Sequence, residues 1–258
     1  MRLGSGGENW CSMRVRYDNR QRSVFRGGRA ETMAHIETRK FEDATADEVR
    51  VRGYLHTPEK ATGDGLVLTH GAGQNCESPL LVALATAFCE AGMTVLRCDL
   101  PFRQVRPQGP PTWPGCAEHD RQGLRRALDE VRKIVPGRVF LGGHSYGGRQ
   151  SSMLAAEEPG LVPAVLLLAY PLHPPKRPAG PRTAHFASLQ TPAMFVSGTR
   201  DGFGTIDEMR EALRLIPART ELLAIGGAGH ELMTAKNRGE STKRVCEAFM
   251  EFIGNEKE

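Results

Sequence analysis

A serine between two glycines lies at the junction of two contrasting segments. Residues 143–147 read Gly-His-Ser-Tyr-Gly, with an apolar, strand-like run before them and a helix-like run after them. A chain that turns sharply from strand to helix exposes the serine hydroxyl at the apex, and the small residues on either side relieve the crowding of that turn. The pattern predicts that Ser145 is a nucleophile that faces the positive N-terminal end of the following helix.

A serine hydroxyl needs a base to take its proton and an acid to orient the base. Asp201 follows an apolar run at 193–197, and His230 follows another at 221–225. If these runs are parallel strands, both residues lie at the same edge of the sheet as Ser145. Their order along the chain is the serine, acid, histidine order that a nucleophile elbow takes. We therefore predict these three as the catalytic residues.

Each of the two partners has a plainer interpretation. Asp201 precedes Gly202, a pair that favours turns, and His230 reads equally as a surface-loop histidine. Asp207 and Glu208 are rival acids, but their positions suit the first turn of a helix, where carboxylates interact well with the helix dipole. Because Asp201 and His230 both follow strands in the required order, they are preferred.

A third apolar run, at 66–69, ends in the glycine-rich turn His70-Gly71-Ala72-Gly73. In a site of this kind, the loop after an early strand and the residue after the nucleophile supply the backbone N–H groups that bind the oxyanion. We predict the N–H groups of Ala72 and Tyr146 for this oxyanion hole. The plainer interpretation of 70–73 is an ordinary tight turn.

Two proline-rich loops, at 99–115 and 170–182, leave the edge of the sheet where ligands bind in such folds. Proline stiffens both loops, so we expect preformed pocket walls and no mobile lid. The longest insertion is under about 20 residues, which leaves no room for a cap domain. The predicted pocket residues are His70, Gly71, Arg103, His144 and His173.

Arg103 has two interpretations within this predicted pocket. It is placed to hold a substrate carboxylate by a two-pronged contact, or to hold its loop by an ion pair, for example with Asp99. His173 is interpreted as structural rather than catalytic, and His144 as a pocket wall rather than a second base.

Apolar and amphipathic runs alternate from about residue 64 onward. This alternation predicts an α/β fold, with a mostly parallel sheet of about seven or eight strands and helices on both faces. Residues 36–41 and 49–55 favour an antiparallel hairpin before it. Ser78 is predicted as the N-cap of a first helix that ends at Gly92, and residues 117–135 carry a clear 3.6-residue apolar period.

With these residues in place, the chain resembles the α/β-hydrolase superfamily over about residues 35 to 256, which implies that fold without a cap domain. It looks closest to the small, lidless, dienelactone-hydrolase-like group. Within that group it resembles a hydrolase-like domain shared by bacterial hydrolases, a testis-expressed protein and a subunit of a chromatin acetyltransferase complex. The segments that carry this narrower resemblance are 70–73, 99–103, 143–149, 170–174 and 198–201.

The dienelactone hydrolases proper use a cysteine nucleophile where this chain has Ser145, so their lactone substrate is not carried over. The resemblance and the predicted residues together indicate a serine hydrolase that cleaves a small ester, thioester or lactone. The alternative is a non-catalytic interaction scaffold, as the resemblance to a chromatin-complex subunit allows. A scaffold has no physical need to keep a serine, an acid and a histidine together, which favours the enzyme.

The length of 258 residues fits one domain. Residues 1–32 hold seven arginines and three acids, which accounts for the whole net charge of +4. The remainder is neutral, so no global basic field for nucleic acid is expected. Residues 1–32 lack apolar periodicity and read as a disordered tail, or as an artefact if Met33 is the true start. Residues 33–258 are predicted to be the α/β-hydrolase domain.

Targeting and metal signals are weak. There is no apolar run of about 18 residues for a membrane span, and no signal-peptide core in residues 1–32. None of the six cysteines forms a C-x-x-C pair, and the histidines lack metal-ligand spacing. We expect a cytoplasmic protein with free thiols, no metal and no cofactor, which acts on a small molecule rather than on nucleic acid or membrane. The oligomeric state stays open.

Overall fold

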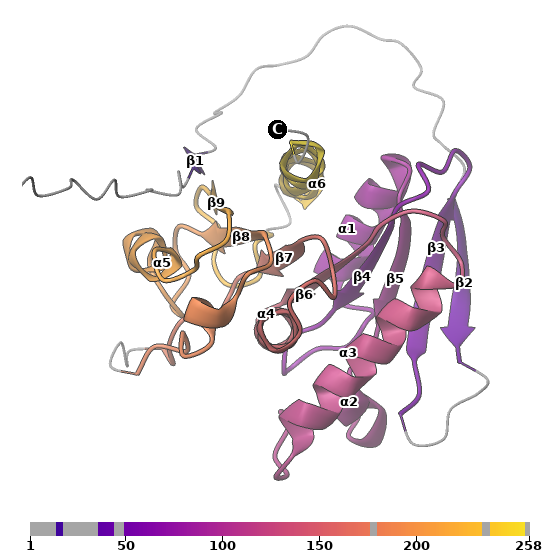
Figure 1. The fold of residues 1–258 in the computed structure, drawn as a ribbon, viewed down its shortest axis with the longest axis horizontal. Helices are drawn as coiled ribbons and strands as arrows, with labels where there is room; N and C mark the ends of the chain where they lie inside the picture. Colours follow the sequence, from indigo (N-terminus) through magenta and orange to yellow (C-terminus); the bar gives the residue numbers. More distant parts are fainter. Residues whose placement is uncertain (1–13, 18–35, 44–48, 176–179, 234–237, 256–258) are drawn as a thin grey trace, which may run out of the picture.

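The structure is a computed structural model that describes residues 14–17, 36–43, 49–175, 180–233 and 238–255 (Figure 1). The strands are β1 (Arg14–Tyr17), β2 (Ile36–Glu42), β3 (Arg52–Pro58), β4 (Gly65–Thr69), β5 (Thr94–Cys98), β6 (Val139–His144), β7 (Val165–Leu168), β8 (Ala193–Gly198) and β9 (Thr220–Ile225). The helices are α1 (Pro79–Glu90), α2 (Pro101–Val105), α3 (Cys116–Arg132), α4 (Tyr146–Glu157), the 3₁₀ turn η1 (Phe186–Ser188), α5 (Ile206–Leu213) and α6 (Arg238–Gly254).

All described strands belong to one nine-stranded sheet in the order β1-β9-β8-β7-β6-β4-β5-β3-β2 (Figure 1). Strand β3 runs antiparallel to both β2 and β5, and all the other neighbouring pairs are parallel. The predicted hairpin is therefore confirmed, and so is the mostly parallel sheet. Strands β2 to β9 account for the eight predicted strands, and β1 is a ninth.

Strand β1 corrects one expectation. We predicted residues 1–32 as a disordered tail, but Arg14–Tyr17 form a strand that pairs in parallel with β9, with Arg14 opposite Glu221. Without β1, strand β9 would lie at the edge of the sheet with unpaired backbone N–H and C=O groups. The four residues of β1 pair with these groups. The other residues of 1–32 lie outside the described residues.

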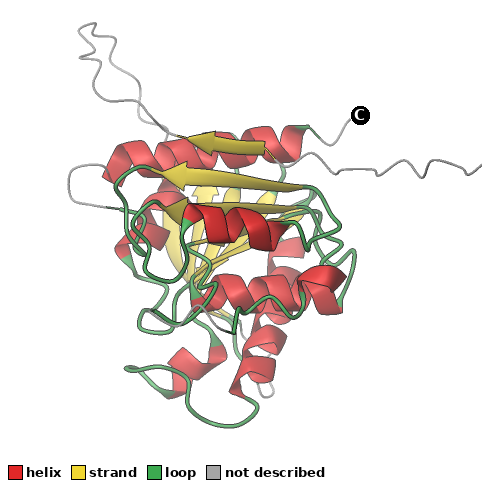
Figure 2. Cartoon of the chain, turned by 90° about the vertical axis from the view of Figure 1, so that its left-hand side faces the viewer, coloured by secondary structure: helices red, strands yellow, loops and turns green. Residues whose placement is uncertain are grey.

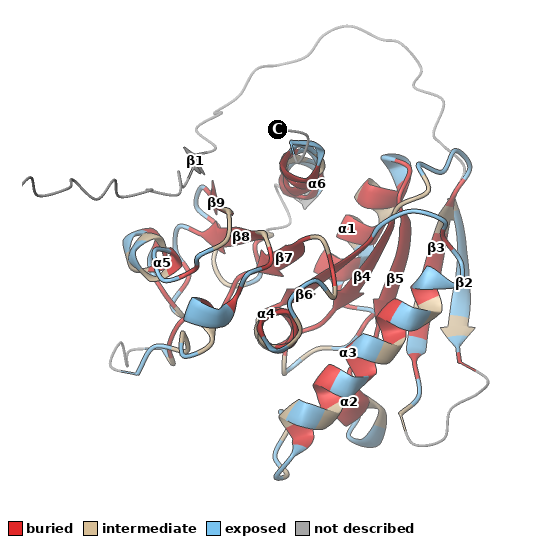
Figure 3. Ribbon diagram, in the orientation of Figure 1, coloured by how far each residue is buried: buried red, intermediate tan, exposed pale blue. Residues whose placement is uncertain are grey.

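Helices cover both faces of the sheet (Figures 2 and 3). Alternating side chains of the buried strands divide the core into two layers. In β6, for example, Phe140 faces the layer covered by α1 and α6, whereas Leu141 faces the layer covered by α3, α4 and α5. Both faces of these strands are buried, as parallel sheets require. The sheet is thereby fixed on both sides, and its carboxyl-end loops have a rigid base.

Helix α2 lies where a loop was predicted. Proline at the first position of a helix has a suitable φ and lacks an N–H that would otherwise be unpaired, so Pro101 allows α2 to begin there. Pro79 does the same for α1, and Ser78 is its N-cap residue as predicted, although the Ser78 side chain makes no capping hydrogen bond.

The five described cysteines are buried free thiols, and Cys11 lies outside the described residues. Within the part of the chain that the structure describes, no helix is both long enough and apolar enough to cross a membrane.

Candidate active site

Ser145 lies at the sharp turn between β6 and α4. Its backbone has φ 51° and ψ −113°, a strained conformation for a residue with a side chain. Its N–H donates to the Leu168 carbonyl at the end of β7 (2.8 Å). A Cβ on Gly143 would lie 2.6 Å from the carbonyl carbon of Gly147, and one on Gly147 would lie 2.5 Å from the His70 carbonyl oxygen. Only glycine permits the close approach that this turn requires, and the turn holds the serine hydroxyl outward.

The three predicted catalytic side chains form one hydrogen-bonded chain. The Ser145 Oγ lies 2.8 Å from His230 Nε2, and His230 Nδ1 lies 2.9 Å and 3.1 Å from the two carboxylate oxygens of Asp201. An ionised carboxylate only accepts hydrogen bonds, so Nδ1 carries the ring hydrogen and Nε2 accepts from the serine hydroxyl. The Asp201 side chain is 3% exposed and that of His230 21%, so the acid is enclosed while the base borders solvent.

The loops that carry the acid and the base are tied to each other. The Arg200 N–H donates to the Ala228 carbonyl (2.9 Å), and the Gly227 N–H donates to the Thr199 hydroxyl (2.8 Å). These bonds join the loop after β8 to the loop after β9. These two bonds fix the distance between the loops of Asp201 and His230. The loops therefore stay together without help from the Asp201–His230 side-chain contact.

Phe203 fixes the plane of the His230 ring. The two rings stack with centroids 4.2 Å apart and planes 30° from parallel. The Phe203 N–H also donates to Asp201 Oδ1 (2.9 Å), so the residue contacts the acid as well as the base. Sequence reasoning did not identify Phe203, because an aromatic residue two positions after an aspartate carries no signal of its own.

His144 lies behind His230 rather than in a pocket wall, which corrects the expectation for it. Its side chain is buried, and its Nε2 donates to the His230 carbonyl (2.9 Å). Its Nδ1 lies 3.1 Å from the side-chain amide of Gln74, which in turn donates to Glu231 (2.6 Å). Burial lowers the pKa of His144. The Gln74–Glu231 bond joins the loop of His230 to the turn after β4, and no pattern in the sequence indicated Gln74.

Of the two predicted oxyanion-hole residues, Tyr146 directly follows Ser145 and Ala72 lies in the turn after β4. Gly71 is buried, and a Cβ there would meet the Ser145 Cβ at 3.4 Å, so the turn after β4 adjoins the nucleophile. Tyr146 is the first residue of α4, where a backbone N–H has no acceptor within the helix. The Tyr146 hydroxyl donates to Asp120 on α3 (2.7 Å), which anchors this side chain away from its own N–H.

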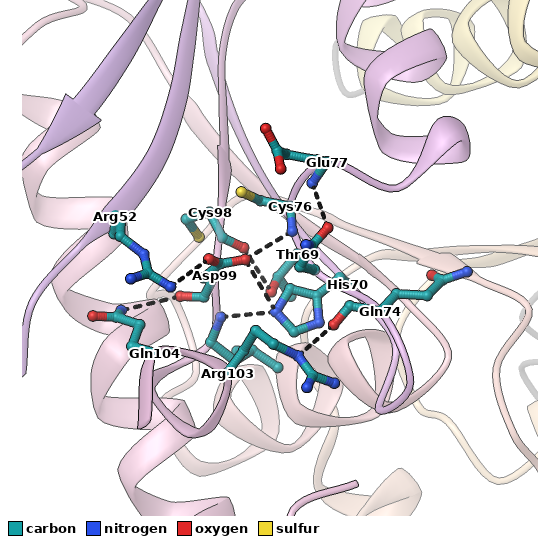
Figure 4. Close-up of polar contacts among 12 residues, drawn as sticks. Arg52, Thr69, His70, Gln74, Cys76, Glu77, Cys98, Asp99, Arg103 and Gln104 are labelled. Atoms are coloured by element: carbon teal, nitrogen blue, oxygen red, sulfur yellow. Dashed lines mark hydrogen bonds and ion pairs between the residues drawn. The ribbon is translucent and has the colours of Figure 1, made fainter. Parts of the chain in front are cut away.

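Arg103 supports the turn after β4 through hydrogen bonds to its carbonyls (Figure 4). Its guanidinium donates to the carbonyls of Gln74 (2.6 Å), Ala72 (2.7 Å), Arg106 (2.9 Å) and Gly109 (3.0 Å), and the residue is only 3% exposed. Its donors hold the loop, as the structural interpretation predicted, although not through an ion pair with Asp99. They are used on backbone carbonyls that fix the position of Ala72.

His70 supports the same turn and does not line a pocket, which corrects a second expectation. The residue is fully buried. Its Nδ1 donates to the Gly71 carbonyl (2.8 Å), and its Nε2 accepts from the Leu100 N–H (3.1 Å) (Figure 4). Burial lowers the pKa of His70 to about 4, so the ring is uncharged at neutral pH, as an acceptor must be.

Asp99 completes this support, because its carboxylate accepts from the Cys76 N–H (2.8 Å) and from Arg52 (3.0 Å) (Figure 4).

His173, by contrast, lies beside α5. Its Nδ1 donates to the Pro174 carbonyl (2.8 Å), and it lines a cavity of about 330 Å³ with Glu208 and other residues of α5 and the preceding loop. None of the residues that line this cavity belongs to the hydrogen-bonded chain of Ser145, which agrees with the structural interpretation of His173.

The two rival acids, Asp207 and Glu208, lie in the first turn of a helix, as the sequence predicted. The side chain of Glu208 accepts from the Thr205 N–H (2.8 Å), and the Thr205 hydroxyl accepts from the Glu208 N–H (3.2 Å). This reciprocal pair is a capping box at the start of α5. Asp207 lies in the same first turn. Both acids therefore belong to the helix end.

Comparison with known proteins gives one family and many similar structures. A family model described as an alpha/beta hydrolase domain matches residues 62–256. The esterase Est1E from Butyrivibrio proteoclasticus has a TM-score of 0.65 at 17% identity, over 84% of this chain and 99% of that one. A dienelactone hydrolase from Anabaena variabilis has a TM-score of 0.64 at 22% identity, over 85% and 98%. An alpha-beta serine hydrolase homologue from Coxiella burnetii has a TM-score of 0.61 at 17% identity, over 82% and 96%.

Proposed function

Because this chain belongs to the α/β hydrolase domain family, we propose that it is a serine hydrolase that cleaves a small ester, thioester or lactone. The observation that carries the proposal is the unbroken chain of hydrogen bonds from the Ser145 hydroxyl through His230 to Asp201. Similar folds among esterases and dienelactone hydrolases support the reaction class.

In the proposed first half-reaction, Ser145 Oγ bonds to the substrate carbonyl carbon while its proton moves to His230 Nε2. The displaced electron pair resides on the carbonyl oxygen, where the N–H groups of Ala72 and Tyr146 stabilise it. Loss of one such donor typically slows a hydrolase by roughly 10²–10³-fold. The carbon–oxygen or carbon–sulfur bond of the substrate then breaks, and the leaving group takes the proton from His230.

In the second half-reaction, water attacks the acyl-enzyme. His230 takes a proton from the water, the water oxygen bonds to the acyl carbon, and the bond to Ser145 breaks as the proton returns to the serine. Asp201 holds the His230 ring with Nδ1–H inward and stabilises the imidazolium that forms twice in the cycle. The products are a carboxylic acid and an alcohol, a thiol, or a single hydroxy acid from a lactone.

Labelling with a fluorophosphonate probe tests the proposal. The probe reacts with activated serines, so we expect it to label the wild-type protein. We expect the Ser145→Ala and His230→Ala variants to lose that labelling. Ser188→Ala is the matched control: this exposed serine in η1 lies outside the site, and its loss should leave labelling unchanged. A folded wild-type protein that takes no label would overturn the proposal and favour a non-catalytic scaffold.

A further inference from the structure

Asp120 is a core carboxylate to which the proposed mechanism gives no role. It lies on α3, is fully buried, and has a pKa that burial raises. An enclosed carboxylate costs free energy unless its oxygens accept strong hydrogen bonds, and an apolar side chain in the same place would avoid that cost. A carboxylate at this position therefore needs a reason other than packing.

The two oxygens of the Asp120 carboxylate bind two different segments. Oδ1 accepts from the Phe102 N–H in α2 (2.9 Å), and Oδ2 accepts from the Tyr146 hydroxyl at the start of α4 (2.7 Å). The Cys116 thiol is a weaker donor to Oδ2 (3.7 Å). Bonds to an ionised acceptor are roughly twice as strong as bonds between neutral groups. Asp120 thus joins α2 to the first residue of α4.

The bond to Tyr146 acts on one of the two predicted oxyanion donors. Tyr146 is the first residue of α4, so its backbone N–H directly follows the nucleophile. Its backbone is held by the helix, and its hydroxyl is held by Asp120 on α3. Because the residue is fixed at both ends, α3 as well as α4 determines where its N–H points.

The bond to Phe102 acts on the other predicted donor, through one neighbour in the chain. Arg103 follows Phe102 in α2, and its guanidinium donates to the carbonyls of Ala72 (2.7 Å) and Gln74 (2.6 Å). A displacement of α2 therefore moves the turn that carries the Ala72 N–H.

Ring contacts and close helix packing connect the same parts. The Phe102 ring contacts the rings of both His70 and Tyr146, with 5.6 Å between the centroids in each pair. Helix α3 also packs tightly on α2, since a Cβ on Gly123 would lie 2.4 Å from the Pro101 Cγ. The two sides of the predicted oxyanion hole thus share one support, which α2 and α3 form together.

We propose that Asp120 is a positioning residue for the oxyanion hole, which holds the N–H groups of Ala72 and Tyr146 at the spacing that the transition state needs. It acts through Phe102 and Arg103 on one side and through the Tyr146 side chain on the other. The proposal rests on the proposed function, because it concerns how the same site stabilises the oxyanion. Displacement of a catalytic group by about 1 Å costs roughly a hundredfold in rate, so a residue that never touches the substrate still affects kcat.

The isosteric variant Asp120→Asn tests this role. One carboxylate oxygen becomes an NH₂ group, which cannot accept, so one of the two bonds is lost. We expect kcat for p-nitrophenyl acetate to fall about ten- to a hundredfold, with KM within about twofold, because the oxyanion forms only in the transition state. A folded Asp120→Asn protein with the wild-type kcat would overturn the proposal.

Asp129→Asn is the matched control for this change. Asp129 is an exposed carboxylate on the same helix, and it pairs with Arg132 (2.8 Å). The substitution alters the same group without any contact to α2 or α4, so kcat and KM should both stay at their wild-type values.

A thiono ester distinguishes a displaced oxyanion hole from a general loss of structure. In p-nitrophenyl thionoacetate, sulfur replaces the carbonyl oxygen and accepts hydrogen bonds only weakly. Displaced donors should therefore slow the ester more than the thiono ester, so the ratio of their kcat/KM values should fall in Asp120→Asn. Partial unfolding or a displaced Ser145 would lower both values by the same factor, and an unchanged ratio would show that Asp120 is only structural.

Tyr146→Phe provides the same test if Asp120→Asn does not fold. It removes one hydroxyl group but keeps the ring and the backbone N–H, so we expect the same changes in kcat and in the ratio, by a smaller factor. A wild-type kcat in this variant contradicts the proposal.

Fluorophosphonate labelling separates this inference from the proposed function. If the wild-type protein takes no label, the proposed function fails and the role of Asp120 fails with it. If the wild-type protein is labelled but Asp120→Asn and Tyr146→Phe keep its kcat, the hydrolase stands and only the positioning role is wrong.

Discussion

At the residue scale, Arg103 in α2 and Arg149 in α4 differ in what their guanidinium groups contact. Arg103 donates to four backbone carbonyls, whereas Arg149 has a buried Nε without a partner. Arg103 uses four of its five guanidinium N–H groups on carbonyls, which leaves one for any other contact. These contacts assign Arg103 a role in the scaffold, which its place in the sequence does not.

Replacement of Arg103 by glutamine should lower kcat for neutral and anionic esters by the same factor. The substitution removes the donors that hold the carbonyls of Ala72 and Gln74, so the Ala72 N–H moves relative to the developing oxyanion. Displacement by about 1 Å costs roughly a hundredfold in rate, so we expect a fall of about ten- to a hundredfold. Steady-state kinetics on monoethyl glutarate and ethyl valerate give the measurement. A loss confined to the anionic ester would instead assign Arg103 to substrate binding.

At the element scale, the turn from β6 into α4 depends on glycine at two positions. In Gly143→Ala, the added methyl group would lie 2.6 Å from the Gly147 carbonyl carbon and could not be accommodated without a shift of α4. We expect about 1–3 kcal/mol of lost stability, as for other overpacked sites, together with the loss of fluorophosphonate labelling. Urea unfolding and labelling provide the two readouts.

Gly239→Ala, at the start of α6, is the control for this change. A Cβ there meets nothing within 4 Å, so stability and labelling should both be retained. If Gly143→Ala behaved like this control, the tight packing of the elbow would not be what holds Ser145 in place.

Sequence reasoning identified the elements whose signals are local. The apolar run at 193–197 lies within strand β8, and the run at 221–225 lies within strand β9. Serine, acid and histidine were found because each follows such a run. Helix α2 was missed, since a proline-rich segment reads as a loop unless the chain around Pro101 is known.

The supporting contacts of the site carry no local signal. Arg103 and Ala72 are far apart in the sequence, and so are His144 and His230. Each pair meets only because the strands before these residues end at one edge of the sheet. Backbone carbonyls are the acceptors in both contacts, and every residue type supplies one. The sequence therefore predicted the reacting groups but not what holds them. The resemblance to a testis-expressed protein and a chromatin-complex subunit stays a prediction.

At the scale of the whole molecule, buried neutral histidines make stability depend on pH. Burial, with the charge of Arg97 for His56, lowers the pKa values of His56 and His70 to about 4 from the ordinary 6.5. Between these values the unfolded chain binds protons that the folded protein does not. The free energy of unfolding should therefore be highest above pH 6.5 and fall as the pH drops toward 4, by up to about 1.4 kcal/mol per pH unit for each histidine.

The variant His56→Gln tests this linkage, because glutamine does not titrate. The wild-type protein and the variant are compared by urea unfolding from pH 4.5 to 7.5. The difference at pH 7.5, where both side chains are neutral, measures lost contacts such as the bond from Arg97 (2.8 Å). The slope below pH 6.5 measures the proton linkage and should be shallower in the variant. Parallel curves would rule out His56 as a contributor.

The pairing of β1 with β9 has a consequence for the order of events during protein synthesis. Arg14 and Glu221 are opposite each other in the finished sheet but stand about 200 residues apart in the chain. At roughly 5–20 residues per second, a ribosome needs about 10–40 s to make the chain between them. During that interval the segment of β1 has no partner strand, while β2 to β8 are made one after another. The first strand to be synthesised is thus among the last to be paired.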